Sequence, residues 1–402
     1  MNILYVLNTT IPTNGATKSF MLMLQQLMQQ GVTPTVILPN RDGIFLELQR
    51  MGVHVLITNY RDATYSYLNT RMDYLKFIPR TIARIILNRR AVRYLTESVK
   101  NTNPTIIHSN VSVLGIGFSL SRRLNVPHIY HIREFADLDF NMHYFPSKAS
   151  FLRRLNAPLS YSISITKVVE QYHHQNGRPT SRVIYNGISY RQHEMPHLPK
   201  QPFFLFAGRI EPAKGLDHLL AAYARYVHLS PQTIMPLKVA GRVHDKNFSK
   251  NIDQFIQQQS IHSWVQFVGE QSNLSSLMQQ ATAIIVPSPN EAFGRVLAEA
   301  MFNGCLCIAL NTAGTREQMD NGKQTQGDEI ALRYDTEDDL IRLLIEVSSH
   351  KPDHYNAYRQ RAFKTVNQLY TIEQNAKNVL MFYQSISQQC SLLSSLQKGV
   401  DN

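Results

Sequence analysis

The feature that most constrains the fold is a regular alternation of short apolar runs with segments of helical periodicity. In the first half of the chain this pattern predicts strands at 3–7, 35–38, 53–58, 105–108, 128–131 and 162–165. It predicts helices between them at 20–30, 44–51, 114–124 and 168–174. Alternating strands and helices favour a parallel sheet with helices on both faces. We therefore expect an α/β fold with a doubly wound parallel sheet.

A second series of the same kind follows a polar stretch that contains Pro196, Pro199 and Pro202. Its expected strands are 203–207, 237–240, 265–268, 283–286 and 305–309, and its expected helices are 216–227, 251–258, 274–278, 295–302 and 340–347. A chain of 402 residues is too long for one ordinary core. We predict two Rossmann-like domains at 1–190 and 203–370, a linker at 191–202, and a final helix with a loose tail at 371–402.

The most informative motif is Pro-Asn-Glu-Ala-Phe-Gly-Arg-Val-Leu-Ala-Glu-Ala-Met at 289–301. It follows an apolar run that we expect to be a buried strand, and it continues into an expected helix. Glu291 lies in the loop and Glu299 lies in the helix, with Gly294 between them. The N–H groups around 293–296 would be free to bind a diphosphate. One carboxylate could then face a sugar and the other a ribose, as a nucleotide-sugar site requires.

Two cations in Phe-Ala-Gly-Arg-Ile-Glu-Pro-Ala-Lys-Gly, at 206–215, suit the same chemistry. Arg209 ends an expected strand and Lys214 lies in the loop that follows. Positive charge placed there would stabilise the charge that develops on a diphosphate leaving group. The structural alternative is a pair of solvated cations. Likewise, Glu299 could be a surface glutamate and Glu291 a partner of the helix dipole.

These motifs together resemble the retaining glycosyltransferases of family 4, which have the GT-B fold. The resemblance also rests on Gly-Ala-Thr-Lys-Ser-Phe at 15–20 and Tyr-Asn-Gly-Ile at 185–188, in the same order along the chain. It implies two Rossmann-like domains facing a cleft and a C-terminal helix that crosses back to the first domain. The expected catalytic residues are Glu291, Arg209, Lys214 and His131. The expected nucleotide-sugar-binding residues are Gly15, Arg209, Lys214, Phe293, Gly294, Arg295 and Glu299.

Some of these assignments have a structural alternative. Gly15 could be a turn glycine, and the chain has Gly15-Ala16 where the family often has two glycines. His131 is expected at the carboxyl end of a strand, but a lone histidine is often structural. Arg133 and Glu134 could bind the acceptor or pair with each other. Asp137-Leu-Asp139 looks like a metal motif, but we interpret it as a surface carboxylate pair and expect neither a metal nor a cofactor.

Charge is distributed unevenly along the chain. Residues 1–200 contain 23 Lys and Arg against 10 Asp and Glu, a net charge of +13, and the remaining residues have a net charge of −1. The segment 71–93 combines seven basic residues with apolar ones, although Pro79 could interrupt a helix there. This composition favours binding to an anionic membrane surface. The structural alternative is a solvated helix face whose apolar side packs on its own sheet. No nucleic-acid-binding signature accompanies the charge, so we exclude nucleic acid as a partner.

The remaining features concern location. The first residues lack the basic region and cleavage site of a signal peptide, and no apolar run reaches the length of a membrane span. The three cysteines suit a reducing cytosol rather than a disulfide. We expect a cytoplasmic enzyme, peripheral at the inner face of the membrane.

The leading hypothesis is a retaining glycosyltransferase that transfers a sugar from a nucleotide-diphosphate-sugar to a glycan or lipid-linked acceptor, as in capsule or exopolysaccharide synthesis. Two alternatives are a non-catalytic GT-B partner of another transferase and a nucleotide-sugar epimerase of related fold.

Overall fold

The computed structural model of the chain describes residues 1–66, 68, 70–196, 198–271 and 273–400, with side chains up to 391. Its contacts divide the chain into two compact units. Unit 1 comprises Met1–Gly187 and Ile372–Asn402, and unit 2 comprises Ile188–Thr371. Each unit contains one large parallel sheet, which confirms the doubly wound α/β fold expected from the sequence.

The sheet of unit 1 has the strand order β3-β2-β1-β5-β6-β8-β9. Its strands are β1 (Asn2–Val6), β2 (Thr33–Leu38), β3 (His54–Ile57), β5 (Ile106–Ser109), β6 (His128–Ile132), β8 (Ser160–Ser164) and β9 (Ser181–Val183). In the centre, Tyr5 of β1 lies opposite Val36 of β2 and His108 of β5. Strand β1 is buried on both faces, and its residues 3–6 form an apolar run, whereas strands β6 and β8 of the same sheet also bury histidine and serine side chains.

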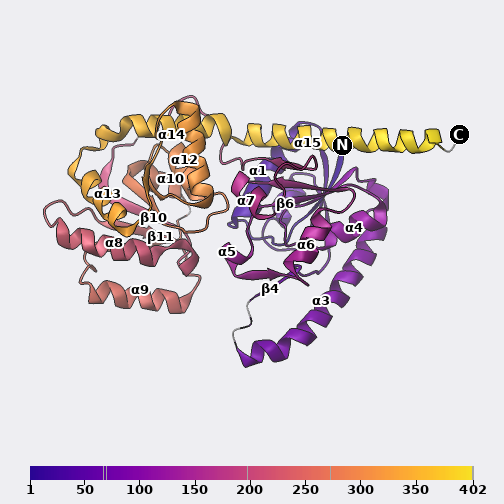
Figure 1. Cartoon of the computed structure of the whole chain (residues 1–402), viewed down its shortest axis with the longest axis horizontal. Helices are drawn as coiled ribbons and strands as arrows, with labels where there is room; N and C mark the ends of the chain where they lie inside the picture. The colour runs from indigo at the N-terminus through magenta and orange to yellow at the C-terminus, as the bar shows by residue number, and fades with distance from the viewer. Residues whose placement is uncertain (67, 69, 197, 272, 401–402) are drawn as a thin grey trace. The chain divides into compact units, whose positions relative to one another are not determined.

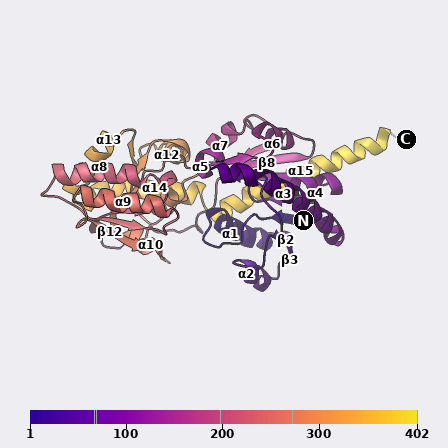
Figure 2. The ribbon, with the colours of Figure 1, turned by 90° about the horizontal axis from the view of Figure 1, so that it is seen from below.

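The remaining residues of unit 1 include nine helical segments within the described part of the chain. They are α1 (Gly15–Gln29), α2 (Phe45–Arg50), α3 (Arg71–Ser98), η1 (Lys100–Thr102), α4 (Ile116–Leu124), α5 (Asp137–Phe140), α6 (Lys148–Leu155), α7 (Lys167–Tyr172) and α15 (Ile372–Val400). A separate antiparallel pair joins β4 (Thr64–Ser66) to β7 (Met142–Tyr144). Helix α15 packs along α1 (Figures 1 and 2). Helix α15 continues as far as Val400, so the backbone of the C-terminal tail that we expected to be loose is helical up to that residue.

Helix α3 is continuous for 28 residues and includes Pro79. The proline, which could have interrupted a helix, lies in its third turn and leaves the helix continuous. The start of the helix is fixed by a capping box, in which Thr70 and Asp73 exchange side-chain and backbone hydrogen bonds. Ala91, Val92 and Leu95 are buried, so α3 is anchored to unit 1 through its C-terminal half.

The sheet of unit 2 has the order β12-β11-β10-β13-β14-β15. Its strands are β10 (Gln201–Ala207), β11 (Leu237–Ala240), β12 (Val265–Gly269), β13 (Ala281–Val286), β14 (Leu306–Leu310) and β15 (Leu332–Tyr334). The expected linker at 191–202 therefore overlaps the start of β10. Strands β10 and β13 are neighbours in the sheet, so the segments that follow them leave from adjacent positions at its carboxyl edge.

The helices of unit 2 are η2 (Pro212–Lys214), α8 (Leu216–Leu229), α9 (Lys246–Gln258), α10 (Leu274–Gln280), α11 (Arg295–Phe302), α12 (Ala313–Gln326), α13 (Glu337–Ser349), η3 (Pro352–Tyr355) and α14 (Asn356–Leu369). Helices α8 and α13 pack together on one face of the sheet, and α14 packs on α11 and α12 on the other (Figure 1). Helix α12 was not expected from the sequence, because this segment is largely polar and includes Gly314 and Gly322.

Candidate functional site

The expected diphosphate loop and the first glutamate of the motif lie at the carboxyl ends of two neighbouring strands. Arg209 and Lys214 follow β10, and Glu291 follows β13. A glycine is needed where these two segments meet. Gly215 has a φ of +68°, and a Cβ added there would lie 2.5 Å from the carbonyl oxygen of Pro287. The backbone of the loop can therefore approach the end of β13 only because residue 215 has no side chain.

The charged side chains of this region form three ion pairs. Lys214 Nζ lies 2.7 Å from Glu291 Oε1, and the two side chains are 25% and 17% exposed. Arg209 Nη2 lies 2.7 Å from Glu211 Oε1. Arg295 Nη2 lies 2.9 Å from Glu299 Oε1, one turn further along α11. The structure thus brings Lys214 into direct contact with Glu291 from a position 77 residues away in the sequence.

Helix α11 begins without a side-chain cap. Its N-cap residue is Gly294, which has a φ of +84° and no side chain to offer. The N-terminal end of a helix carries a partial positive charge and N–H groups that can bind an anion. Phe293 is buried, with its ring edge against Tyr370 at a centroid separation of 5.4 Å. Phe293 therefore anchors the loop, and the start of α11 suits a phosphate group.

Residues of α12 and of the turn before it support the Glu291 loop, and no motif in the sequence indicated them. The Gly314 N–H donates to the Glu291 carbonyl oxygen at 2.8 Å, and the Thr312 hydroxyl donates to that of Pro289 at 3.2 Å. The Gln318 side-chain amide donates to the carbonyl oxygens of Phe293 and Gly294. These contacts end on backbone carbonyl oxygens far away in the sequence, so no local motif in the sequence could have indicated them.

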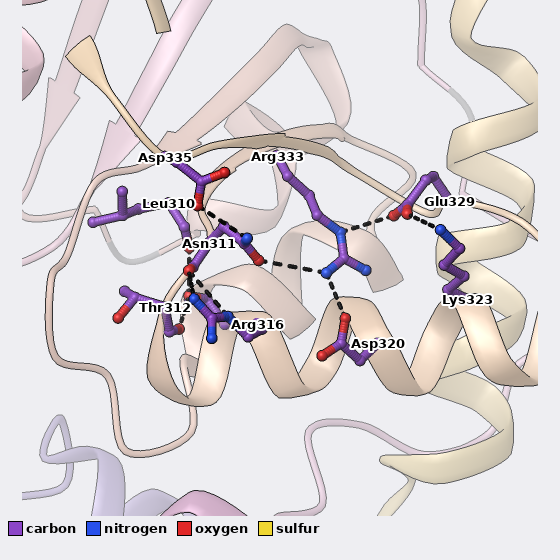
Figure 3. Close-up of polar contacts among 10 residues, drawn as sticks. Leu310, Asn311, Thr312, Arg316, Asp320, Lys323, Glu329, Arg333 and Asp335 are labelled. Atoms are coloured by element: carbon purple, nitrogen blue, oxygen red, sulfur yellow. Dashed lines mark hydrogen bonds and ion pairs between the residues drawn. The ribbon is translucent and has the colours of Figure 1, made fainter. Parts of the chain in front are cut away.

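Charged residues fix the turn from β14 into α12, as Figure 3 shows. The Arg316 guanidinium donates to the Asn311 carbonyl oxygen at 2.7 Å, and the Asn311 side-chain amide donates to Asp335 at 3.0 Å. Arg333 binds Glu329 at 2.8 Å and also contacts Asp320. Ala313, next in the turn, has a φ of +42°, which is unfavourable for a residue with a side chain. This network holds the strained turn in place beneath the Glu291 loop.

The other two expected site residues, Gly15 and His131, belong to unit 1. Gly15 is the exposed first residue of α1. The preceding Asn14 caps this helix, since its side-chain oxygen accepts hydrogen bonds from the N–H groups of Ala16 and Thr17. Unlike α11, helix α1 therefore begins with two of its N–H groups already bound by a side chain.

His131 lies in β6 and is fully buried. Its Nδ1 lies 3.1 Å from Nε2 of His108 and 3.3 Å from Nη2 of Arg133. The other ring nitrogen of His108 lies 2.5 Å from the hydroxyl of Tyr383 in α15. Burial, together with the charge of Arg133, lowers the pKa of His131 well below its usual value. His131 is therefore neutral and forms part of a polar cluster inside unit 1.

Arg133 and Glu134 are also buried. The Arg133 guanidinium donates to the Asn110 carbonyl oxygen at 3.0 Å and also binds Asn186. Glu134 accepts hydrogen bonds from the backbone and hydroxyl of Ser112, at 2.7 and 2.6 Å. Burial raises the pKa of Glu134 to about 7. Both residues hold together the loops at the carboxyl edge of the sheet.

The two carboxylates of Asp137-Leu-Asp139 have separate partners. Asp139 accepts hydrogen bonds from the N–H groups of Phe135 and Ala136, at the start of α5. Asp137 binds the Tyr172 hydroxyl and lies 3.6 Å from Lys148. Among the described residues, no group of three or more His, Cys, Asp or Glu side chains could hold a metal ion. In the same part of the chain, no helix is long and apolar enough to cross a membrane.

Two family models match consecutive parts of the chain. The model described as Glycosyltransferase Family 4 matches residues 13–192, and the model described as Glycosyl transferases group 1 matches residues 191–365. The chain therefore belongs to the family 4 glycosyltransferases with the GT-B fold, which confirms the resemblance found in the motifs. It is an enzyme that uses nucleotide sugars as donors.

Similar proteins agree with this assignment. The chain is 22% identical to the uncharacterized glycosyltransferase MJ1178 of Methanocaldococcus jannaschii, over 75% of this chain and 83% of that protein. It is 30% identical to a D-inositol 3-phosphate glycosyltransferase of Rhodococcus jostii, over 31% of this chain and 28% of that protein. Among solved structures, HepE of Anabaena in complex with UDP and glucose has a TM-score of 0.71 at 18% identity, covering 97% of this chain and 99% of that chain.

A glycosyltransferase from Rickettsia africae has a TM-score of 0.73 at 18% identity, covering 96% of this chain and 98% of that chain. At this level of identity, the two solved structures establish the fold.

Proposed function

We propose that the chain is a retaining glycosyltransferase whose donor binds to unit 2. The observation that carries this proposal is the grouping of Arg209, Lys214, Glu291 and the uncapped start of α11 at the ends of two neighbouring strands. Arg209 and Lys214 would bind the diphosphate and stabilise its charge as the sugar bond breaks. Glu291 would bind the sugar hydroxyls, and Glu299 would bind the ribose.

The ion pairs of the site support these roles. Three cations and three carboxylates occur in partly exposed pairs. A bound diphosphate could take over the cations, because phosphate and guanidinium or ammonium groups form strong charge-assisted hydrogen bonds. The Glu291 carboxylate would then be released toward the sugar. Thermal-shift and hydrolysis screens over UDP-, GDP-, dTDP- and ADP-sugars test this assignment. The anomeric configuration of the product, measured by NMR, tests retention.

Chelation provides a further test of the proposal. The side chains of Arg209 and Lys214 supply the positive charge that a metal ion would otherwise provide. We therefore propose a metal-independent reaction and expect turnover to be unchanged in EDTA. Loss of turnover in EDTA, with recovery on adding Mn²⁺ or Mg²⁺, would contradict the proposal and point again to Asp137 and Asp139.

We further propose that α3 binds the membrane at its cytoplasmic face, and that the acceptor is a lipid-linked or envelope glycan of the capsule or exopolysaccharide type. One face of α3 exposes large apolar side chains, namely Met72, Leu75, Ile78, Ile82 and Ile86. Leu75 and Ile78 are 72% and 67% exposed. Exposed arginines lie near this face at 89, 90 and 93. Arg84, in contrast, points inward, with its guanidinium 5.5 Å from the centre of the Phe145 ring.

Replacing Arg89, Arg90 and Arg93 by Glu should release the protein from vesicles containing anionic lipid. Each basic residue near such a surface contributes about 1 kcal/mol, and salt screens the attraction. Binding is measured by vesicle sedimentation at low and high salt. The matched control replaces three exposed arginines outside α3, Arg41, Arg122 and Arg123, by Glu. If both triple variants bind equally, or the native protein does not bind at low salt, α3 is not a membrane-binding helix.

A further inference from the structure

Unit 1 contains two adjoining cavities beside the β4–β7 pair. The first has a volume of about 310 Å³ and the second about 250 Å³. Tyr65 of β4 and Met142 of β7 line both cavities. Cavities of about 300 Å³ are at the lower end of the size range of ligand sites. Together, the two could hold two small rings joined to each other.

These cavities lie at the edge of the sheet where ligands bind in folds of this class. The segment that carries β4 follows β3, and the segment that carries β7 follows β6. Strands β3 and β6 point in the same direction, because all strands of this sheet are parallel. Both segments therefore leave the sheet at its carboxyl edge, where ligands bind in open parallel α/β sheets.

Three arginine side chains line the first cavity. Arg84, from α3, lines it, and its Nε and Nη1 atoms are buried without a hydrogen-bond partner among the described residues. Arg61 and Arg80 line the same cavity. Leaving buried guanidinium donors unbonded costs free energy, and an anionic group is their strongest partner. The arginine fork matches the planar carboxylate and the phosphate group.

The other lining groups suit a sugar. Asp62 lines the cavity near Arg84 and Arg61, and burial raises its pKa to about 6 despite their charge. A carboxylate in this position can accept hydrogen bonds from sugar hydroxyls. The Tyr65 ring contacts those of Phe77 and His143, at centroid distances of 5.2 and 5.3 Å. Aromatic rings of this kind provide apolar surface for the C–H faces of a sugar.

We propose that the two cavities bind successive sugar units of the acceptor glycan, and that Arg84 binds a carboxylate or phosphate group on one of them. This inference rests on the proposed function, and it adds that the acceptor is an anionic glycan. Helix α3 contributes both to the proposed membrane binding and to the first cavity. Phe77, Thr81 and Arg84 face the cavity, whereas Ile78, Ile82 and Ile86 are exposed. The lipid of the acceptor and its first sugars would thus bind the same helix.

The test measures sugar binding to the full chain by saturation-transfer NMR. The probes are three disaccharides of one linkage: one with a uronic acid, one with a 6-phosphate and one neutral. We expect at least one anionic probe to bind about tenfold more tightly than the neutral one. Whichever anionic disaccharide binds more tightly, the uronic acid or the 6-phosphate, shows whether Arg84 prefers a carboxylate or a phosphate group. Arg84→Gln should remove this preference. Arg80→Gln, whose side chain is 63% exposed in the native protein, should reduce it less.

Arg122→Gln, an exposed arginine of α4, serves as the control and should retain the preference. Thermal shifts with UDP and GDP, measured on the same variants, report on unit 2 separately. If nucleotide binding fails while anionic sugars still bind through Arg84, the donor assignment is wrong and the sugar site stands. Equal binding of neutral and anionic probes, binding of none of them, or an Arg84→Gln protein with native preference would overturn the inference.

Discussion

Replacing Lys214 by Ala should lower turnover about 10²- to 10³-fold in a protein that remains folded, because the charge of the leaving group loses one of its partners in the transition state. Arg209→Ala should have a similar effect. Stability should change little, since a partly exposed ion pair such as Lys214–Glu291 contributes about 1 kcal/mol or less. Steady-state kinetics with the donor found by the nucleotide-sugar screen, together with thermal unfolding, measure the two effects.

The control for this experiment is Lys250→Ala, which removes an exposed lysine from α9 in the same unit. It should leave turnover and stability unchanged. If Lys214→Ala and Arg209→Ala both retain near-native turnover, the two side chains do not stabilise the leaving group. The donor site would then have to be placed elsewhere in the chain.

Gly314→Ala should reduce turnover on the order of 10²-fold, although residue 314 is outside the expected donor-binding motifs. A Cβ at this position would lie 2.6 Å from the carbonyl oxygen of Glu291 and 2.8 Å from that of Ala292. The loop must therefore move, and a shift of about 1 Å in a residue that positions the substrate can cost this much. The loss should appear in kcat, with thermal unfolding showing that the protein is folded.

Gly327→Ala is the matched control, at the opposite end of the same helix α12. Gly327 has a φ of +79°, and an added Cβ would meet no atom within 4 Å. The substitution should destabilise the fold by about 1–2 kcal/mol, because a left-handed conformation is unfavourable for alanine, while kcat stays native. If Gly314→Ala also keeps its native kcat, contact with α12 does not position Glu291.

Much of the fold was predictable because it depends on local patterns. The apolar runs gave most of the strands to within two residues, and the segment 295–302 was predicted with the same bounds as α11. Buried parallel strands have continuous apolar sequences, and helices that cover them have a 3.6-residue period. Helix α12 lacks both signals, since its sequence is polar and its position depends on contacts with the Glu291 loop and β15.

For the candidate site too, some features could be predicted from local sequence and others only from the folded structure. The motifs around Arg209, Lys214 and Glu291 could be recognised in the sequence, because their residue types and spacings resemble those of the family 4 glycosyltransferases. The burial of His131 could not be predicted, because it depends on His108 and Tyr383, which come from other elements. For the same reason, only the folded unit showed that Arg84 faces a cavity while its neighbours in α3 are exposed.

The sequence by itself determined the α/β class through its periodicity, and its motifs indicated the family by resemblance, together with the charged groups that we propose bind the donor. The tertiary structure decided which groups meet. It placed Lys214 against Glu291 through the pairing of β10 with β13. It also placed Gly314 beneath the Glu291 loop and lined the cavities of unit 1 with residues from three separate segments. These contacts arise from the packing of distant segments, which local sequence does not encode.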